Sequence, residues 1–275
     1  MKTIYRLLLT GLILATLTPV ALALKPSMEY KVRPEKYQIK YEEQSISTPD
    51  GATLKAWYFP TDKARAFEHI IMSHNGEGNM ADNLARVTQL TSYGYNVLIY
   101  DYRGFGESSA FEIDEAMYVY PEFTTDLQAV IDHMGAKYTG NIHLYGFGIG
   151  AGLSFGVGWH HKKVKKIVAD APYTSLAQTK QILGGQGTTV KLPDFGYDKK
   201  HEPFFALDGN PTTIRGVQII CGGADPGLNE KVYKELQKKN KTLVSIHIIP
   251  SVKNDNTFDN NRDQYIKDIV AYLQK

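Results

Sequence analysis

Residues 146–150 read Gly-Phe-Gly-Ile-Gly, a turn that joins two apolar segments of different kinds. The segment before the turn, residues 141–145, is a short apolar run typical of a buried strand. The segment after it, residues 151–159, is small and apolar, as in a buried helix. A strand, a glycine-rich turn and a helix in this order predict a βα unit of an α/β fold. Gly148, at the centre of the turn, has no side chain with which to do chemistry.

Predicted strands and helices alternate on both sides of this unit. A strand over 37–48, the turn Pro49-Asp50-Gly51 and a strand over 52–59 predict a hairpin. Buried strands are expected at 69–72, 97–100, 164–170, 217–221 and 243–249. Helical periodicity marks 82–93, 122–134, 230–239 and 263–273. The alternation predicts one domain over 24–275, with a mostly parallel central sheet flanked by helices. Residues 171–211 lack clear periodicity and are predicted to cross the sheet edge as a short cap.

Three further motifs directly follow predicted strands. They are His74-Asn-Gly-Glu-Gly-Asn79, Asp101-Tyr-Arg-Gly-Phe-Gly-Glu-Ser108 and Ala171-Pro-Tyr-Thr-Ser-Leu176. Taken with the turn at 146–150, they make the chain from about Tyr37 onward resemble the BEM46-like, serine aminopeptidase-type branch of the α/β-hydrolases. The resemblance implies an α/β-hydrolase fold, in which the catalytic serine, acid and histidine follow one another in that order.

The resemblance assigns three residues of this chain to the catalytic positions. Gly148 occupies the position of the nucleophilic serine, Asp225 that of the acid, and Asn254 that of the histidine. Serine attacks only when a base takes its proton, and asparagine is no general base near neutral pH. Two of the three functions are therefore expected to be lost. Glycine at 148 also has a structural explanation, because it adopts a strained elbow conformation without steric cost.

The oxyanion hole of such a fold is made by backbone amides, which substitutions leave in place. The resemblance assigns it to the amides of Asn75 and Ile149, with His74 orienting the loop; Asn75 replaces a glycine of the family pattern. We therefore expect a non-catalytic pseudo-hydrolase that binds or scaffolds, with a small acyl, ester or peptide-like ligand under the cap. No cofactor and no metal are expected, and the one cysteine, Cys221, excludes a cysteine-rich metal site.

Two other functions stay open on the sequence. A working ester or peptide hydrolase with a relocated nucleophile would use Ser73, Ser108, Ser154 or Cys221. A dinucleotide-binding protein would use Gly146–Ala151, which fits Gly-x-Gly-x-x-Ala, with Asp170 ending the next strand. The second alternative is weakened because that fingerprint belongs on the first strand of its unit, whereas strand-loop motifs of hydrolase type precede it here.

The N-terminus reads as a secretory signal over residues 1–23. Lys2 and Arg6 precede an apolar core, and Ala21-Leu22-Ala23 is a small-x-small cleavage site. Cleavage would give a secreted or periplasmic protein; an uncleaved segment would be a membrane anchor. Removing Lys2 and Arg6 from the 31 basic residues leaves 29, equal to the 29 acidic ones. Such a balance gives no electrostatic reason to expect a nucleic-acid partner, and it predicts no oligomeric state.

Overall fold

The computed structural model describes residues 23–63, 65, 67–211 and 213–275. Apart from Ala23, the predicted signal segment therefore lies outside the described residues. No helix in this described part of the chain is long and apolar enough to cross a membrane.

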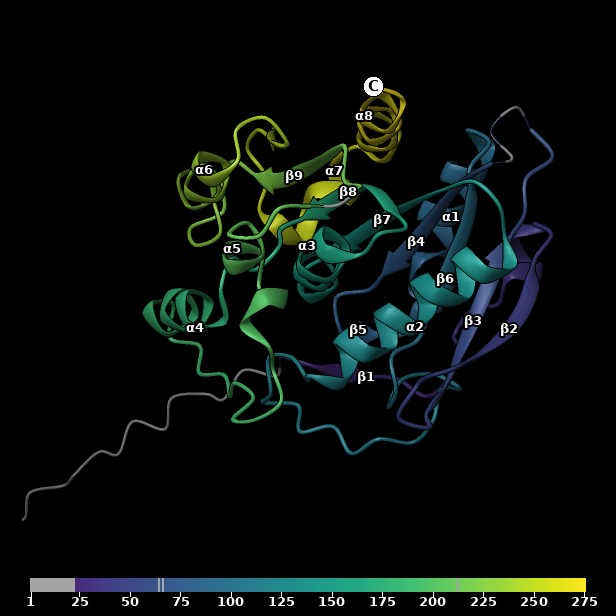
Figure 1. The fold of residues 1–275 in the computed structure, drawn as a ribbon, viewed down its shortest axis with the longest axis horizontal. Helices are drawn as coiled ribbons and strands as arrows, with labels where there is room; N and C mark the ends of the chain where they lie inside the picture. The colour runs from purple at the N-terminus through teal and green to yellow at the C-terminus, as the bar shows by residue number, and fades with distance from the viewer. Residues whose placement is uncertain (1–22, 64, 66, 212) are drawn as a thin grey trace, which may run out of the picture.

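A mostly parallel sheet of eight strands forms the centre of the molecule (Figure 1). Its strand order is β10-β9-β8-β7-β4-β6-β3-β2, with antiparallel pairing only where β3 joins β2 and β6. The strands are β2 (Glu42–Ser47), β3 (Thr53–Phe59), β4 (Glu68–Ser73), β6 (Asn96–Tyr100), β7 (Asn141–Phe147), β8 (Val164–Asp170), β9 (Gly216–Gly222) and β10 (Val244–Ile249). The sequence prediction of a hairpin leading into a parallel sheet is confirmed.

Helices cover both faces of this sheet. One core joins the sheet to α2 (Glu122–Lys137), α3 (Ile149–His160) and α6 (Glu230–Lys239), and the other joins it to α1 (Leu84–Ser92) and α8 (Arg262–Gln274). The remaining helices are α4 (Leu176–Gly185), α5 (Pro203–Ala206), α7 (Thr257–Asn260) and the 3-10 turns η1 (Pro34–Tyr37), η2 (Met80–Asn83), η3 (Lys199–His201) and η4 (Asn254–Asn256). Three layers, helices on sheet on helices, therefore enclose two apolar cores.

Residues 171–211 carry more structure than their sequence suggests. They include α4, η3 and α5, and η3 packs so tightly on α3 that a side chain at Gly156 would clash with the His201 carbonyl. The helix α4 buries only Leu176 and Thr179, so it shows little of the periodicity by which an amphipathic helix is recognised. The first strand of the hairpin, β2, also begins later than expected, at Glu42, because Pro34–Tyr37 form a 3-10 turn.

A short N-terminal strap, residues 24–30, lies across the loop that follows β4. Its strand β1 (Lys25–Pro26) pairs in parallel with β5 (Glu77–Gly78). The Lys25 amide donates to the Gly76 carbonyl at 2.8 Å, and the Leu24 side chain is fully buried. The Tyr30 hydroxyl donates to Asp101 Oδ2 at 2.6 Å, further along the same surface. The strap thus fixes the loop from His74 to Asn79 against the body of the domain.

Candidate functional site

Gly148 stands between the end of β7 and the start of α3, with φ 56° and ψ −124°. Its amide donates to the Asp170 carbonyl at 2.9 Å, which ties the turn to the neighbouring strand. A positive φ of this size favours glycine. The flanking glycines serve close packing instead, because a side chain at Gly146 would clash with the Gly150 carbonyl, and one at Gly150 with the Ser73 carbonyl. The Gly-x-Gly-x-Gly pattern is therefore explained position by position.

The loop after β4 brings Asn75 next to this turn. A Cβ atom at Gly148 would lie 3.0 Å from the Asn75 Cβ, so the two backbones approach each other closely. His74 points away into the core, where only 2% of it is exposed among the rings of Tyr102 and Phe105. Its Nδ1 accepts from the Gly76 amide at 3.2 Å, and burial lowers the pKa of His74 to about 3. His74 is thus neutral and shapes the loop.

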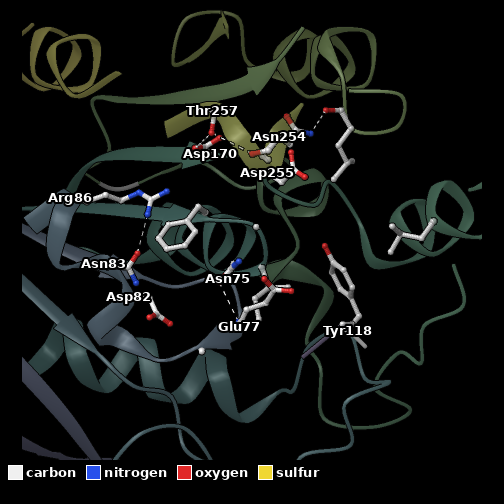
Figure 2. Close-up of a pocket in the computed structure, with 18 of the residues that line it drawn as sticks. Asn75, Glu77, Asp82, Asn83, Arg86, Tyr118, Asp170, Asn254, Asp255 and Thr257 are labelled. Atoms are coloured by element: carbon white, nitrogen blue, oxygen red, sulfur yellow. Dashed lines mark hydrogen bonds between the residues drawn. The ribbon is translucent and has the colours of Figure 1, made fainter. Parts of the chain in front are cut away.

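A cavity of about 720 Å³ opens over the turn (Figure 2). Asn75, Gly148, Ile149 and Asn254, four of the six residues assigned to the site from the sequence, line it together. The cap contributes Ala171 and Leu183 to the wall, as expected of a segment crossing this edge of the sheet. Asp225 and His74 do not line the cavity. The carboxyl ends of β7 and β8 and the loops after β4 and β10 therefore all line this one cavity.

Asp225 and Asn254 lie in adjacent loops and contact each other through the backbone of Asn254. The Asn254 amide donates to Asp225 Oδ2 at 3.2 Å. The Asn254 side chain is fully engaged: its Oδ1 accepts from the Gly222 amide at 2.8 Å, and its Nδ2 donates to the Leu228 carbonyl at 2.7 Å. Asp225 Oδ1 accepts from the Gly227 amide at 2.9 Å. The two side chains hold their loops in place.

Asp170, at the end of β8, is a buried carboxyl group in the cavity wall. It is 2% exposed, and its Oδ2 accepts from the Thr257 hydroxyl at 2.7 Å and the Tyr265 hydroxyl at 2.6 Å. Its Oδ1 has no hydrogen-bond partner among the described residues. Burial raises the pKa of Asp170 to about 6. In the sequence, Asp170 was weighed for the dinucleotide alternative and as an acidic residue that hydrolases often carry before Ala-Pro-Tyr, but it was not assigned to the site. Its place at the carboxyl end of a strand was the signal for that assignment.

Arg86 is a site residue that the sequence analysis missed. Its guanidinium lies 4.6 Å from the Phe147 ring centre and 4.0 Å from that of Phe258. Its Nη1 donates to Asn83 Oδ1 at 3.3 Å, the dashed line in Figure 2. Two aromatic faces and one amide thus fix a cation at the cavity wall. Its position on the predicted helix 82–93 did not indicate a site residue, because the two rings that contact it come from β7 and α7, which are distant in the sequence.

The alternative nucleophiles lie elsewhere. Ser73 is fully buried with its hydroxyl 3.0 Å from that of Tyr100, and Ser108 donates to the Asp101 carbonyl at 2.8 Å. Ser154 is fully buried inside α3. Burial raises the pKa of the Cys221 thiol to about 12, which keeps it protonated. None of these four residues lines the cavity at Gly148.

Comparison with known proteins finds a matching family model and several relatives. A family model described as serine aminopeptidase, S33, matches residues 66–193. The Escherichia coli K12 protein YfhR is 25% identical over 243 residues, covering 84% of this chain and 80% of YfhR. The α/β-hydrolase domain-containing protein WAV2 of Arabidopsis thaliana is 22% identical over 267 residues, covering 90% of this chain and 83% of WAV2.

Solved structures agree with the architecture. The Pyrococcus furiosus esterase Pf2001 superposes with a TM-score of 0.70 and 20% identity, covering 91% of this chain and 96% of the esterase. The α/β hydrolase GrgF from Penicillium sp. sh18 superposes with a TM-score of 0.64 and 15% identity, covering 86% and 98%. At these identities the two structures establish the fold alone. From its sheet, its turn at Gly148 and these similarities, the chain has the α/β-hydrolase fold and is similar to serine aminopeptidase-type hydrolases.

Proposed function

We propose that this protein is a non-catalytic member of the α/β-hydrolase superfamily, which binds a small acyl, ester or peptide-like ligand in the cavity at Gly148. One observation carries the proposal: none of the described residues that line the cavity is a serine, a cysteine or a histidine. The hollow persists at about 720 Å³, while the serine and the histidine of a catalytic triad are missing from the part of its wall that the structure describes. Such a cavity favours binding without turnover.

The oxyanion amides provide the polar end of the proposed ligand site. Asn75 and Ile149 both line the cavity, and both follow a strand end that close packing fixes. Backbone amides at these positions would donate to a carbonyl oxygen of the ligand. The apolar side chains of Ile149, Leu183 and Leu228 would pack against its acyl part.

Turnover and binding are tested separately. With p-nitrophenyl acetate and butyrate, we expect the protein and its Asp225→Ala variant to give the same rate. For binding, ethyl butyrate is followed by saturation-transfer NMR in the protein and in Leu183→Trp, which places a large ring at the cavity wall. The control, Gln181→Trp, carries the same new ring on the same helix outside the cavity.

Two outcomes would contradict the proposal. Turnover that falls in Asp225→Ala would mean that a working hydrolase site exists. Saturation transfer that is absent, or equal in Leu183→Trp and Gln181→Trp, would mean that the cavity at Gly148 takes no such ligand.

We also propose that the protein acts outside the cytoplasm, because Lys2, Arg6 and the apolar run after them form a signal pattern. Mass spectrometry of the protein recovered from its native host should give a chain that begins at Leu24. A mature protein that retains Met1 to Ala23 would point to a membrane anchor.

A further inference from the structure

A second cavity, of about 490 Å³, lies at the opposite end of the sheet from Gly148. Glu68 opens β4, and Arg215 directly precedes β9, so this cavity is at the amino ends of the parallel strands. Gly148 follows the carboxyl end of β7, and the two cavities share no lining residue. We call the second cavity the basic cup and define it by Arg65, Glu68, His143, Lys165, Lys166 and Arg215.

Positive charge exceeds negative charge in the basic cup. Four of its six defining residues carry a positive charge, and Glu68 is the one carboxylate among them. Within the described part of the chain, Arg65, Lys165 and Arg215 form no salt bridge. Like charges that outnumber the counter-charges near them repel one another, and a bound anion reduces that repulsion.

Glu68 is already occupied by hydrogen bonds inside the cup. Its Oε2 lies 2.6 Å from His143 Nε2, and its Oε1 accepts from Asn141 Nδ2 at 2.9 Å. The Glu68 carboxylate therefore forms no salt bridge with Arg65, Lys165 or Arg215. His143 is 3% exposed, and its Nδ1 has no hydrogen-bond partner among the described residues. Because its Nε2–H is donated to the Glu68 carboxylate, the neutral imidazole keeps Nδ1 as an acceptor, so His143 positions Glu68 and is not counted among the anion donors of the cup.

Lys166 places a buried ammonium beside that imidazole. It is 8% exposed, and β7 and β8 pair His143 with Lys166 in register. Its Nζ donates to the carbonyls of Tyr272 at 3.2 Å and Leu273 at 3.1 Å, in the last turn of α8. An ammonium has three protons, so one donor is left over. Burial, and next the positive charge of Arg215, lower the pKa of Lys166, and an anion in the cup would reverse the second effect.

We propose that the basic cup binds a small molecule or headgroup that carries a phosphate-type oxyanion. Two arginines and a lysine without salt bridges call for more than a single negative charge, which a phosphate monoester or diphosphate supplies. Its tetrahedral oxygens accept hydrogen bonds from several directions, and guanidinium groups match them in pairs. Lys166 lines the cup and has one donor beyond its two backbone partners. This site is independent of the function proposed for the cavity at Gly148.

Calorimetric titration with inorganic pyrophosphate tests the proposal on the full chain. Arg215→Gln and Lys165→Gln each remove one exposed or half-buried cation of the cup, and each should weaken binding about fivefold. Lys267→Gln removes the same charge from an exposed position of α8 outside the cup and should leave the affinity unchanged. Raising the salt concentration should weaken binding, because the contacts are ionic.

A second arm separates a soluble ligand from a lipid. Vesicles of phosphatidic acid, whose headgroup is a phosphate monoester, and of phosphatidylcholine are sedimented with the protein and with Arg215→Gln. Binding to phosphatidic acid vesicles alone, lost in Arg215→Gln, would identify a lipid headgroup as the source of the phosphate; binding of pyrophosphate alone would identify a soluble ligand. The proposal is overturned if neither probe binds, or if Lys267→Gln weakens binding as much as Arg215→Gln does.

Discussion

Replacing Gly148 by alanine should destabilise the protein, although it adds only a methyl group. The turn holds φ at 56°, and an L-residue in such a conformation costs about 1–3 kcal/mol. The new Cβ would also lie 3.0 Å from the Asn75 Cβ, so the loop after β4 must move by a few tenths of an ångström. We expect a loss of about 1–3 kcal/mol in the free energy of unfolding, or about 2–4 °C in Tm for each kcal/mol.

Urea denaturation followed by circular dichroism measures this loss, and two further variants locate its origin. Gly184→Ala is the control, because Gly184 lies in α4 with no atom within 4 Å of an added Cβ; it should be neutral or stabilise by up to about 1 kcal/mol. Gly148→Ala combined with Asn75→Gly removes the close contact and leaves the strained φ. A double variant whose loss equals the sum of the single losses would assign the whole effect to φ. Gly148→Ala as stable as the parent protein would refute the reasoning.

Three other predictions concern chemistry and charge. Gly148→Ser should give no measurable hydrolysis of p-nitrophenyl butyrate, since no histidine among the described residues lines the cavity. Asn254→His is the second change to add to Gly148→Ser. A Gly148→Ser variant as active as the double variant would show that Asn254 does not hold the position of the base. The folded-state pKa of Asp170, about 6 against 3.8, means that the folded protein binds more protons between these values, so stability falls as pH rises from about 4 to 6. In urea denaturation, the free energy of unfolding of the parent protein should rise by up to about 3 kcal/mol relative to that of Asp170→Asn as pH falls through this range. A difference between the two proteins that does not change with pH would contradict this. Asp126→Asn should cost about 3–5 kcal/mol in thermal or urea unfolding, because it leaves the buried Arg103 guanidinium without the carboxylate that accepts from its Nε at 2.9 Å; a loss below about 1 kcal/mol would show that Asp50 alone suffices for Arg103.

Local sequence patterns predicted most of the fold because each of those elements is recognisable by itself. The helix expected over 230–239 matches α6, whose apolar residues recur at helical spacing, and the Pro49-Asp50-Gly51 turn joins β2 to β3 as predicted. The pairing of β1 with β5 escaped prediction, since two-residue strands have no period. The helix α4 was not predicted, because it lies exposed in the cap and buries few apolar residues, so it shows little helical periodicity.

The residues of the candidate site also fall into two groups, those that local motifs predicted and those that depend on the tertiary structure. Asn75, Gly148, Ile149 and Asn254 were assigned from motifs that follow strands, and the ends of parallel strands converge at one edge. The environment of a side chain is harder to read from the sequence. Arg86 is held by two rings from distant segments, and the raised pKa of Asp170 depends on burial. Both properties arise only when the tertiary structure has formed.

The N-terminal strap has a consequence for the order in which the chain can fold. The Leu24 amide donates to the Glu115 carbonyl at 3.1 Å, and the Tyr30 hydroxyl donates to Asp101. Residues 24–30 leave the ribosome before these partners, which emerge some seventy to ninety residues later. At a synthesis rate of about 5–20 residues per second, the strap waits several seconds before it can dock. Until then the strap can pair only with Gly76 and Gly78 of the loop after β4, so its anchoring to the rest of the domain is completed later than that pairing.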